Sequence, residues 1–280
     1  MDMEYIVENA TGKYTLGKFL SNKAKLSRRL IITLKKTNGL FVNEKTQFTN
    51  YILKNGDKIK IVMPSEELSD VTPQKMELDI IYEDEHLLII NKASGVAMHP
   101  TLNYQDLTLA NGVAYYCKDN PFPFRPANRL DKDTSGLVLI AKDKFTAGHL
   151  SKQLKENKIE KVYEALVCGT PNPLEAEISA PVGRCEDSII KRCVTESGVP
   201  SQTKYKVLEK GDKCLVEVFP ITGRTHQIRV HMAHIGHPLY ADFLYGEEIK
   251  GEHFYLHCKE LKFVHPATSK EITISCKRPF

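Results

Sequence analysis

The feature that most constrains this chain is the run from Asn128 to Asp143, NRLDKDTSGLVLIAKD. It begins as a polar turn that carries two carboxylates, Asp131 and Asp133, and continues as an uninterrupted apolar segment from Leu137 to Ala141. A short, β-rich apolar run bounded by a glycine and a lysine is typical of a buried sheet strand. Charged groups at the mouth of such a strand can be directed into a cleft by a rigid scaffold. A helix cap or a surface ion pair would explain a lone Arg-Leu-Asp, but not the whole polar block.

This block resembles the signature of the RluA- and RluD-type RNA pseudouridine synthases, which modify large ribosomal RNA. In that family, a His-Arg-Leu-Asp-x-Asp-Thr-Ser-Gly-Leu segment carries the catalytic aspartate. Asn128 stands where the family has histidine, and the rest of the segment matches. The resemblance implies that Asp131 is the catalytic residue. It also implies that Arg129 stacks or forms hydrogen bonds in the space that the target base vacates when it leaves the RNA stack.

Two further segments match the family and add site residues. The run from Lys161 to Gly169 alternates in the manner of a strand, and Tyr163 within it matches the active-site tyrosine that lies on or near the base. The run from Ile221 to Gly246 matches a Thr-Gly-Arg-Thr-His-Gln-Ile-Arg-Val-His stretch followed by Ile-Gly-His-Pro-Leu-x-x-Asp-x-x-Tyr-Gly. By this match, Arg224 is the basic partner of the catalytic aspartate. Ala241 stands where glycine is usual, so we expect a slightly altered backbone there.

An opening segment and a closing segment complete the resemblance, which runs in order from residue 77 to residue 276. The opening segment comprises residues 91–96 with 99–100, and the closing segment comprises residues 256–258 with 263–266.

The implied reaction breaks the glycosidic bond of uridine, rotates the base and rejoins it through carbon. It requires one ionised carboxylate beside the sugar, kept charged by a cation, and no redox step, metal or phosphoryl transfer. The carboxylate could attack the anomeric carbon, stabilise an oxocarbenium ion or abstract a sugar proton, and the sequence does not choose among these. A hydrolytic glycosidase usually needs a second carboxylate, and Asp133 would point elsewhere in an extended segment. We expect no cofactor.

Four histidines lie close together in the long matching segment, which raises the alternative of a metal site. Zinc sites usually combine histidine with cysteine or carboxylate ligands at characteristic spacings, and no such pattern is evident here. We expect no metal; these side chains should bond to backbone groups or contact phosphate. The four are His226, His231, His234 and His237.

Positive charge is concentrated in the first quarter of the chain. The net charge is +4, and the stretch from Lys13 to Lys60 contains twelve Lys or Arg against only Glu44 and Asp57. That stretch therefore carries +10 and leaves −6 for the remainder. A basic module attached to a mildly acidic body is the electrostatic pattern of a protein that binds nucleic acid. A solvated basic face on a structural domain remains the alternative.

The same stretch resembles the small RNA-binding module first described in a small-subunit ribosomal protein, the S-four-like module. The marks are Leu-Ser-Arg at residues 26–28, Val-Asn at 42–43 and Gly-Asp-Lys-Ile at 56–59. We expect this module at residues 1–63, a polar linker at 64–75 and the catalytic domain at 76–280. The side chains expected to contact RNA are Arg129, Lys25, Arg28, Arg29, Lys45 and Arg229.

The expected fold class is α+β, with a mixed, mainly antiparallel sheet, flanking helices and the small N-terminal α/β module. Many β-rich segments with a few helices between them argue against a doubly wound sheet. Helices are expected from residue 16, from an N-cap at Ser27 through Lys36, and near residues 106–116, 144–155 and 227–235. The expected strands include residues 40–43, 58–63, 78–82, 87–92, 137–141, 162–168, 203–208, 214–220 and 271–275.

Composition is that of an ordinary globular protein, at 41% hydrophobic and 26% charged residues. No apolar run approaches the ~20 residues of a membrane span, and the first residues do not resemble a secretory signal. The seven cysteines are odd in number and scattered, which favours reduced thiols. We therefore expect a cytoplasmic monomer that acts on RNA away from membranes. Large-subunit ribosomal RNA is the favoured substrate; the alternatives are transfer RNA, or a non-catalytic RNA-binding assembly factor on the same scaffold.

Overall fold

The computed structural model describes residues 2–10, 12–63, 71–102 and 104–280. Buried side chains in these residues form two separate hydrophobic cores. One core is built from residues between Val7 and Ile61, and the other from residues between Leu87 and Phe263. None of the helices in the described ranges is long and apolar enough to cross a membrane.

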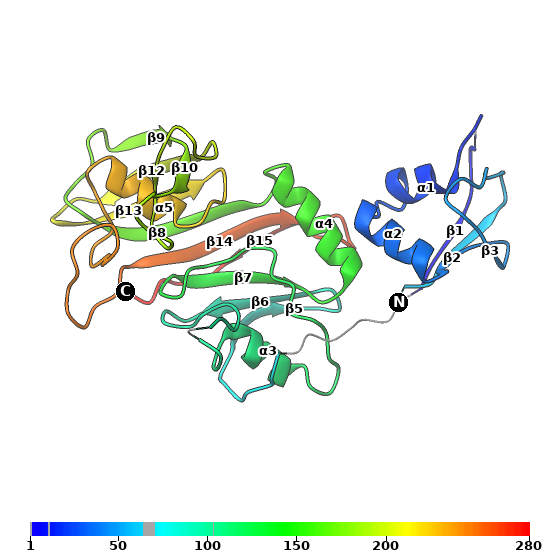
Figure 1. Cartoon of the computed structure of the whole chain (residues 1–280), viewed down its shortest axis with the longest axis horizontal. Coiled ribbons are helices and arrows are strands. Elements are labelled where there is room, and N and C mark those ends of the chain that lie inside the picture. Colours follow the sequence, from blue (N-terminus) through cyan, green and yellow to red (C-terminus); the bar gives the residue numbers. More distant parts are fainter. Residues whose placement is uncertain (1, 11, 64–70, 103) are drawn as a thin grey trace.

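The N-terminal core is enclosed by an antiparallel sheet and two helices (Figure 1). These elements are β1 (Met3–Ile6), α1 (Leu16–Asn22), α2 (Arg28–Lys36), β2 (Leu40–Val42), β3 (Lys45–Thr46) and β4 (Lys58–Ile61), with strand order β1-β4-β2-β3. The expected cap of α2 is confirmed, because the Ser27 hydroxyl accepts a hydrogen bond from Leu30 N at 3.2 Å. Asn38, just after this helix, has a φ of 52°. Strand β1 was not expected from the sequence.

The larger core lies around a long mixed sheet, so the expected α+β class is confirmed. Its strands are β5 (Asp79–Glu83), β6 (Leu87–Lys92), β7 (Ser135–Ala141), β8 (Glu160–Cys168), β9 (Glu175–Ser179), β12 (Gln202–Glu209), β13 (Lys213–Pro220), β14 (Leu256–Val264) and β15 (Glu271–Ser275). The order is β5-β6-β7-β14-β8-β13-β12-β9, with β15 beside β14. A separate hairpin comprises β10 (Val182–Arg184) and β11 (Arg192–Val194), and the helices are α3 (Leu109–Tyr116), α4 (Lys144–Lys155) and α5 (Gln227–His234).

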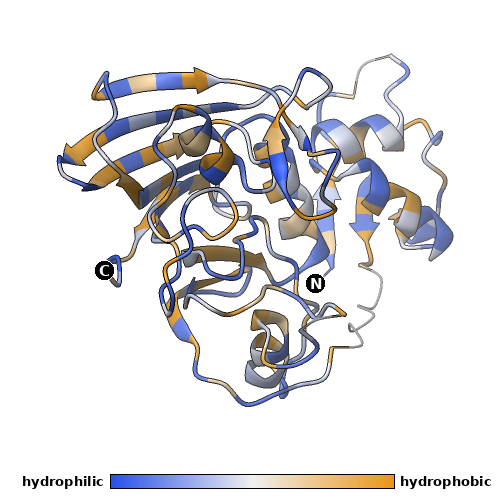
Figure 2. Cartoon of the chain, turned by 60° about the vertical axis from the view of Figure 1, so that its left-hand side comes forward, coloured by the Kyte–Doolittle hydropathy of each residue, from blue (hydrophilic) through white to orange (hydrophobic). Residues whose placement is uncertain are grey.

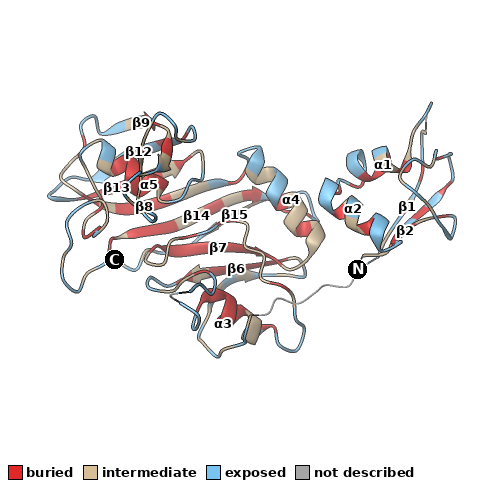
Figure 3. Cartoon of the chain, in the orientation of Figure 1, coloured by how far each residue is buried: buried red, intermediate tan, exposed pale blue. Residues whose placement is uncertain are grey.

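Strand β7 is the strand predicted from the apolar run, and it lies inside the sheet. All seven of its residues are buried, and Figure 3 shows it in red between β6 and β14. Strands farther along the sheet carry alternating hydrophilic and hydrophobic residues, as expected where one face meets solvent (Figure 2). The polar turn with Asp131 therefore sits at the start of the most deeply buried strand.

The pairing of β7 with β14 is parallel, whereas the other strand pairs in this sheet are antiparallel. Gly136 lies at this junction with a φ of 111°. A Cβ at that position would lie 2.3 Å from the carbonyl oxygen of Cys258 on β14. The close approach of the two backbones requires a residue without a side chain at this point.

Helix α4 connects the two cores. Its Phe145 side chain packs against the N-terminal core, and Gly148 lies beside Ser27 at the start of α2. Figure 1 shows α2 facing α4 across this contact. The module is thereby held against the helix that follows β7.

Candidate active site

A cleft of about 890 Å³ opens beside the turn that precedes β7. Among the described residues that line it, Asp131 is the only one with a carboxylate. The cationic and imidazole side chains of the lining are His99, Arg129, Lys132, Lys155, Lys161, Arg224, His226 and Arg229. The cleft is thus electropositive around a single acidic group.

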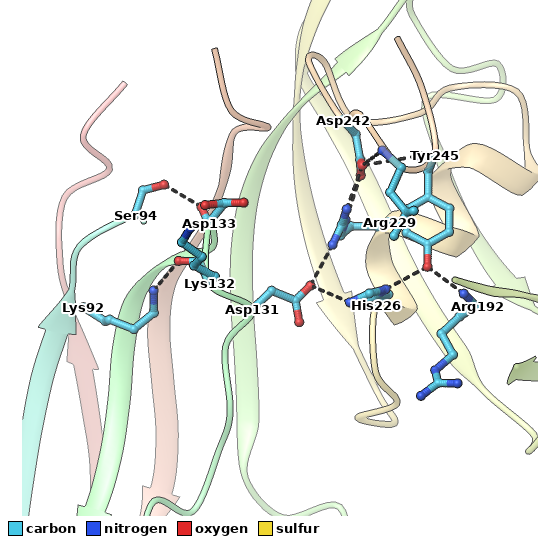
Figure 4. Close-up of polar contacts among 11 residues, drawn as sticks. Lys92, Ser94, Asp131, Lys132, Asp133, Arg192, His226, Arg229, Asp242 and Tyr245 are labelled. Carbon is cyan, nitrogen blue, oxygen red and sulfur yellow. Dashed lines mark hydrogen bonds and ion pairs between the residues drawn. The ribbon is translucent and has the colours of Figure 1, made fainter. Parts of the chain in front are cut away.

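The turn that carries Asp131 is fixed through its backbone. Lys92, at the end of β6, is 1% exposed, and its amine donates hydrogen bonds to the carbonyls of Ala93, Val96 and Lys132 at 2.8 to 2.9 Å. Burial lowers the pKa of Lys92 to about 7, although Asp133 and Asp131 favour its charged form. Lys92 therefore connects β6 to the residue that follows Asp131 (Figure 4).

The other acidic residue of the turn, Asp133, does not line the cleft. Its carbonyl oxygen accepts a hydrogen bond from Ser94 at 2.8 Å, and its carboxylate oxygen Oδ1 is buried without a hydrogen-bond partner among the described residues. The expectation that Asp133 points away from Asp131 is confirmed by this geometry.

Arg229, and not Arg224, is the arginine that contacts Asp131. Arg229 Nη1 lies 3.2 Å from Asp131 Oδ2, whereas Arg224 is exposed and forms no ion pair in the part of the chain that the structure describes. The predicted pairing of Arg224 with the aspartate is therefore wrong. The reason is local geometry: Arg224 lies in the loop before α5, and Arg229 lies inside that helix on its buried side.

Arg229, which the sequence suggested as an RNA contact, is held by side chains of the protein. Its side chain is 4% exposed, and it forms a two-pronged ion pair with Asp242 through Nε and Nη2, both at 2.7 Å. The guanidinium also lies over the rings of Tyr245 and Phe254, with 4.9 and 4.2 Å to the ring centroids. These contacts leave Nη1 for Asp131 and orient the fork rigidly.

Asp242 anchors Arg229, and the sequence analysis did not single it out, although it lies in the matching segment from Ile221 to Gly246. It is 0% exposed, and it also accepts backbone N–H bonds from Leu244 and Tyr245. The residue before it, Ala241, has a φ of 59°, a left-handed conformation that explains why glycine is usual there. Ala241 thus holds a conformation that glycine favours, which leaves a strained alanine next to the anchor of Arg229.

His226 is a second group close to Asp131. Its Nε2 lies 3.8 Å from Asp131 Oδ2, and its Nδ1 lies 2.8 Å from the hydroxyl of Tyr245. That hydroxyl accepts a hydrogen bond from Arg192 N at 2.9 Å. Figure 4 shows this chain of contacts running from β11 to the carboxylate.

Tyr163, the predicted active-site tyrosine, lies on β8 and lines the cleft. It is 7% exposed. Burial raises the pKa of Tyr163 well above the usual value, and nearby Cys258 and Asp131 raise it further. Its ring thus presents an uncharged, flat surface beside the carboxylate. Leu256 on β14 adds an aliphatic side chain to the same lining.

Two other residues of the signature lie in different environments. Asn128, which replaces the family's histidine, is buried and bridges β7 through bonds to Leu137 O and from Leu139 N, both at 2.9 Å. Arg129 is exposed and lines the cleft, in a position open to RNA. Asn128 therefore connects the polar turn to β7 through two hydrogen bonds.

The predicted RNA contacts of the N-terminal module lie outside the cleft. They are exposed, and the four residues are Lys25, Arg28, Arg29 and Lys45. No group of three or more His, Cys, Asp or Glu side chains within the described ranges is arranged to hold a metal ion. His231 instead bonds to Thr203 and to the carbonyl of Ala180, both at 2.9 Å.

Comparison with known proteins agrees with the family resemblance found in the sequence. The RNA pseudouridylate synthase family matches residues 86–234. The RNA pseudouridine synthase YhcT of Bacillus subtilis is 35% identical over 99% of this chain and 94% of its own length. Ribosomal large subunit pseudouridine synthase C of Vibrio cholerae is 33% identical, over 91% of this chain and 87% of that protein.

A solved structure shares the fold. Human RNA Pseudouridylate Synthase Domain Containing 1 superposes with a TM-score of 0.63 and 31% sequence identity, over 76% of this chain and 87% of that one. The matched segment contains Asp131, Tyr163 and Arg229. This chain belongs to the RNA pseudouridine synthase family.

Proposed function

We propose that this RNA pseudouridine synthase isomerises uridines of large-subunit ribosomal RNA, with Asp131 as the catalytic residue. The observation that carries the assignment of Asp131 is its position as the single carboxylate among the described cleft-lining residues, in contact with the buried Arg229. Ribosomal RNA is favoured because a relative from Vibrio cholerae is named a ribosomal large subunit pseudouridine synthase.

One carboxylate is what the reaction requires. The bond from uracil N1 to the ribose breaks, a bond from C5 to the same ribose carbon forms, C5 loses its proton and N1 gains one. The guanidinium of Arg229 donates a charge-assisted hydrogen bond to the carboxylate of Asp131 at 3.2 Å. A hydrolase of the usual kind would need a second carboxylate facing the first, and Asp133 lies outside the cleft.

The rest of the cleft suits a flipped uridine. Tyr163 and Leu256 offer an aromatic and an aliphatic surface for the base, and Arg129 offers a cation at the exposed rim. These groups would stack on or hydrogen-bond to the nucleotide while Asp131 meets the sugar.

The N-terminal module would bind RNA outside the cleft. Its exposed Arg28 and Arg29 lie in the first turn of α2, the helix that faces α4. At the other end of α4, Lys155 lines the cleft. Phosphate contacts along this helix would lead an RNA strand from the module toward Asp131.

The assignment of Asp131 is tested by Asp131→Asn with Asp133→Asn as its matched control. Asp131→Asn keeps the shape but removes the charge, so turnover of a uridine substrate should fall below detection while RNA affinity is retained. Asp133→Asn should leave most of the turnover, because Asp133 is held by a hydrogen bond to its backbone carbonyl, which the substitution keeps. Measurable turnover by Asp131→Asn would contradict the assignment.

The substrate is tested by mapping pseudouridines in RNA from cells that lack the protein. The expected result is the loss of one or more pseudouridines from large-subunit ribosomal RNA and their return when the wild-type chain is expressed. Loss from transfer RNA alone would replace the proposed substrate by the alternative one.

A further inference from the structure

Both protein contacts to the carboxylate of Asp131 fall on the same oxygen. Arg229 Nη1 lies 3.2 Å and His226 Nε2 lies 3.8 Å from Oδ2. No hydrogen bond or ion pair to Oδ1 is found among the described residues. The carboxylate is therefore held by one edge, with its other oxygen left for the cleft (Figure 4).

The hydrogen bonds of Tyr245 favour one of the two neutral tautomers of His226. Arg192 N can only donate, so the phenol oxygen accepts at that contact. Among the described residues the phenol has one other hydrogen-bond partner, His226 Nδ1 at 2.8 Å, so the phenol proton finds an acceptor only if Nδ1 carries no hydrogen. A neutral imidazole that accepts at Nδ1 carries its hydrogen on Nε2, and this is the nitrogen that faces Asp131.

The surroundings of His226 favour the neutral ring. Burial lowers the pKa of His226, and so do the charges of Arg229 and Arg192. The charges of Asp131 and Asp242 raise the pKa by less, so the pKa is lowered overall. The backbone of His226 is left-handed, with a φ of 58°, and the side chain does not cap α5. Residues other than glycine seldom adopt this conformation, and here the side chain lies 3.8 Å from the carboxylate of Asp131.

We propose that Tyr245 fixes His226 as the Nε2–H tautomer, and that His226 and Arg229 together occupy Oδ2, so that Oδ1 is the oxygen of Asp131 that meets the ribose. The proposal rests on the catalytic role of Asp131 proposed above. His226 is a positioning residue in this scheme, because it acts through Asp131 and not on the substrate. The 3.8 Å separation would shorten to a hydrogen bond when RNA closes the site, as catalytic contacts often do.

The tautomer can be measured without any activity. In the full-length protein labelled with ¹⁵N-histidine, long-range ¹H–¹⁵N spectra at neutral pH should show His226 with hydrogen on Nε2 alone. Comparison with His226→Gln assigns the signals. In Tyr245→Phe, the same signals should move to the average of two tautomers. A neutral ring with hydrogen on Nδ1 in the wild type would overturn the proposal.

Kinetics test the function of the tautomer. Tyr245→Phe keeps the ring beside the guanidinium of Arg229 and removes only the hydroxyl, so the single-turnover rate at saturating RNA should fall about tenfold with unchanged RNA affinity. Tyr205→Phe is the matched control, because its buried hydroxyl bonds to the carbonyl of Pro173 at 2.9 Å, away from the cleft. That variant should keep the wild-type rate.

Two substitutions of His226 complete the test. His226→Gln keeps an N–H donor near the ε position and should retain more of the single-turnover rate than His226→Leu, which keeps none. Equal rates for the two, or a change in RNA affinity alone, would overturn the proposal. Activity in Asp131→Asn would instead remove the catalytic role of Asp131, while the tautomer spectrum of His226 would stand, so the two failures are distinguishable.

Discussion

The two arginines around the start of α5 occupy different environments, and this determines which one can act on Asp131. Arg229 is buried between two aspartates, whereas Arg224 projects from an exposed loop. A buried guanidinium that is paired with Asp242 is already oriented before the substrate binds. An exposed arginine would have to lose side-chain conformational freedom to reach the same orientation.

Arg229→Lys should therefore impair both catalysis and stability. A lysine has one amine in place of the fork, so it cannot satisfy Asp242 and Asp131 together. We expect the single-turnover rate to fall about 10- to 100-fold and the free energy of unfolding to fall by about 3 kcal/mol. Rapid-quench kinetics and urea denaturation would measure the two effects. Arg224→Lys is the control, and a larger rate loss in that variant would restore the pairing predicted from the sequence.

A substitution at Ala241 should stabilise the protein. Its left-handed backbone is strained for alanine but accessible to glycine, so Ala241→Gly should raise the free energy of unfolding. The relief of strain is offset by the greater freedom of glycine in the unfolded chain, leaving a gain of about 0.5 kcal/mol. Urea denaturation would measure it. Ala110→Gly inside α3 is the contrasting variant and should be less stable than the wild type. A loss of stability in Ala241→Gly would show that packing of the Ala241 methyl group stabilises the fold by more than the backbone strain destabilises it.

At the scale of elements, the turn between β5 and β6 is connected to the turn between β14 and β15 through Asp84. Its carboxylate accepts hydrogen bonds from Tyr82, from the backbone N–H groups of His86 and Leu87, and from His265 Nε2, at 2.7 to 2.8 Å. Burial would raise the pKa of Asp84, but these hydrogen bonds outweigh it and lower the pKa to about 2.

The depressed pKa of Asp84 predicts a pH-dependent contribution to stability. The stabilisation is present above the ordinary aspartate value near 4 and is lost as the pH falls toward 2. Asp84→Asn should therefore lower the free energy of unfolding by about 2 kcal/mol at pH 7 and by much less near pH 2. Urea denaturation across this range would measure the difference. Glu85→Gln, at the exposed neighbouring position, should leave the free energy of unfolding at pH 7 near the wild-type value; a constant deficit in Asp84→Asn would refute the linkage.

Elements with a strong local signal were predictable from the sequence. Strand β7 is buried along its whole length, and α4 occupies residues Lys144–Lys155 as expected, with the side chain of Asp143 as its cap. Strands β1 and β9 were missed because they are only four and five residues long, and both are held by pairing with strands distant in the sequence. Arg229 was misassigned for a similar reason, since its anchor, Asp242, lies 13 residues away.

At the scale of the whole molecule, the basic module is placed against α4 by the packing of Phe145 on the module's core. Deleting the module would uncover that side chain, so changes of surface charge are a cleaner probe of RNA binding. The exposed positions Arg28, Arg29 and Lys45 can be replaced by alanine without disturbing either core.

The triple variant Arg28→Ala, Arg29→Ala, Lys45→Ala should bind structured RNA more weakly and with a shallower dependence on salt. The slope of log K against log salt should fall by roughly 0.7–0.9 for each phosphate that the variant no longer neutralises, while turnover at saturating RNA stays near the wild-type value. Filter binding at several salt concentrations would measure it. A control triple at Lys206, Lys210 and Lys270, which are exposed outside the cleft, should leave the slope unchanged. A normal slope with a collapsed maximal rate would show that the module supports the cleft instead.

The parallel pairing of β7 with β14 has a consequence for the synthesis of the protein. His257, the partner of Ser135, is translated 122 residues later, a delay of roughly 6–24 s at 5–20 residues per second. During that interval, one edge of the most apolar strand in the chain has no partner, and such edges promote aggregation. We therefore expect the strand that follows the Asp131 turn to expose an unpaired edge in the nascent chain until β14 has been made.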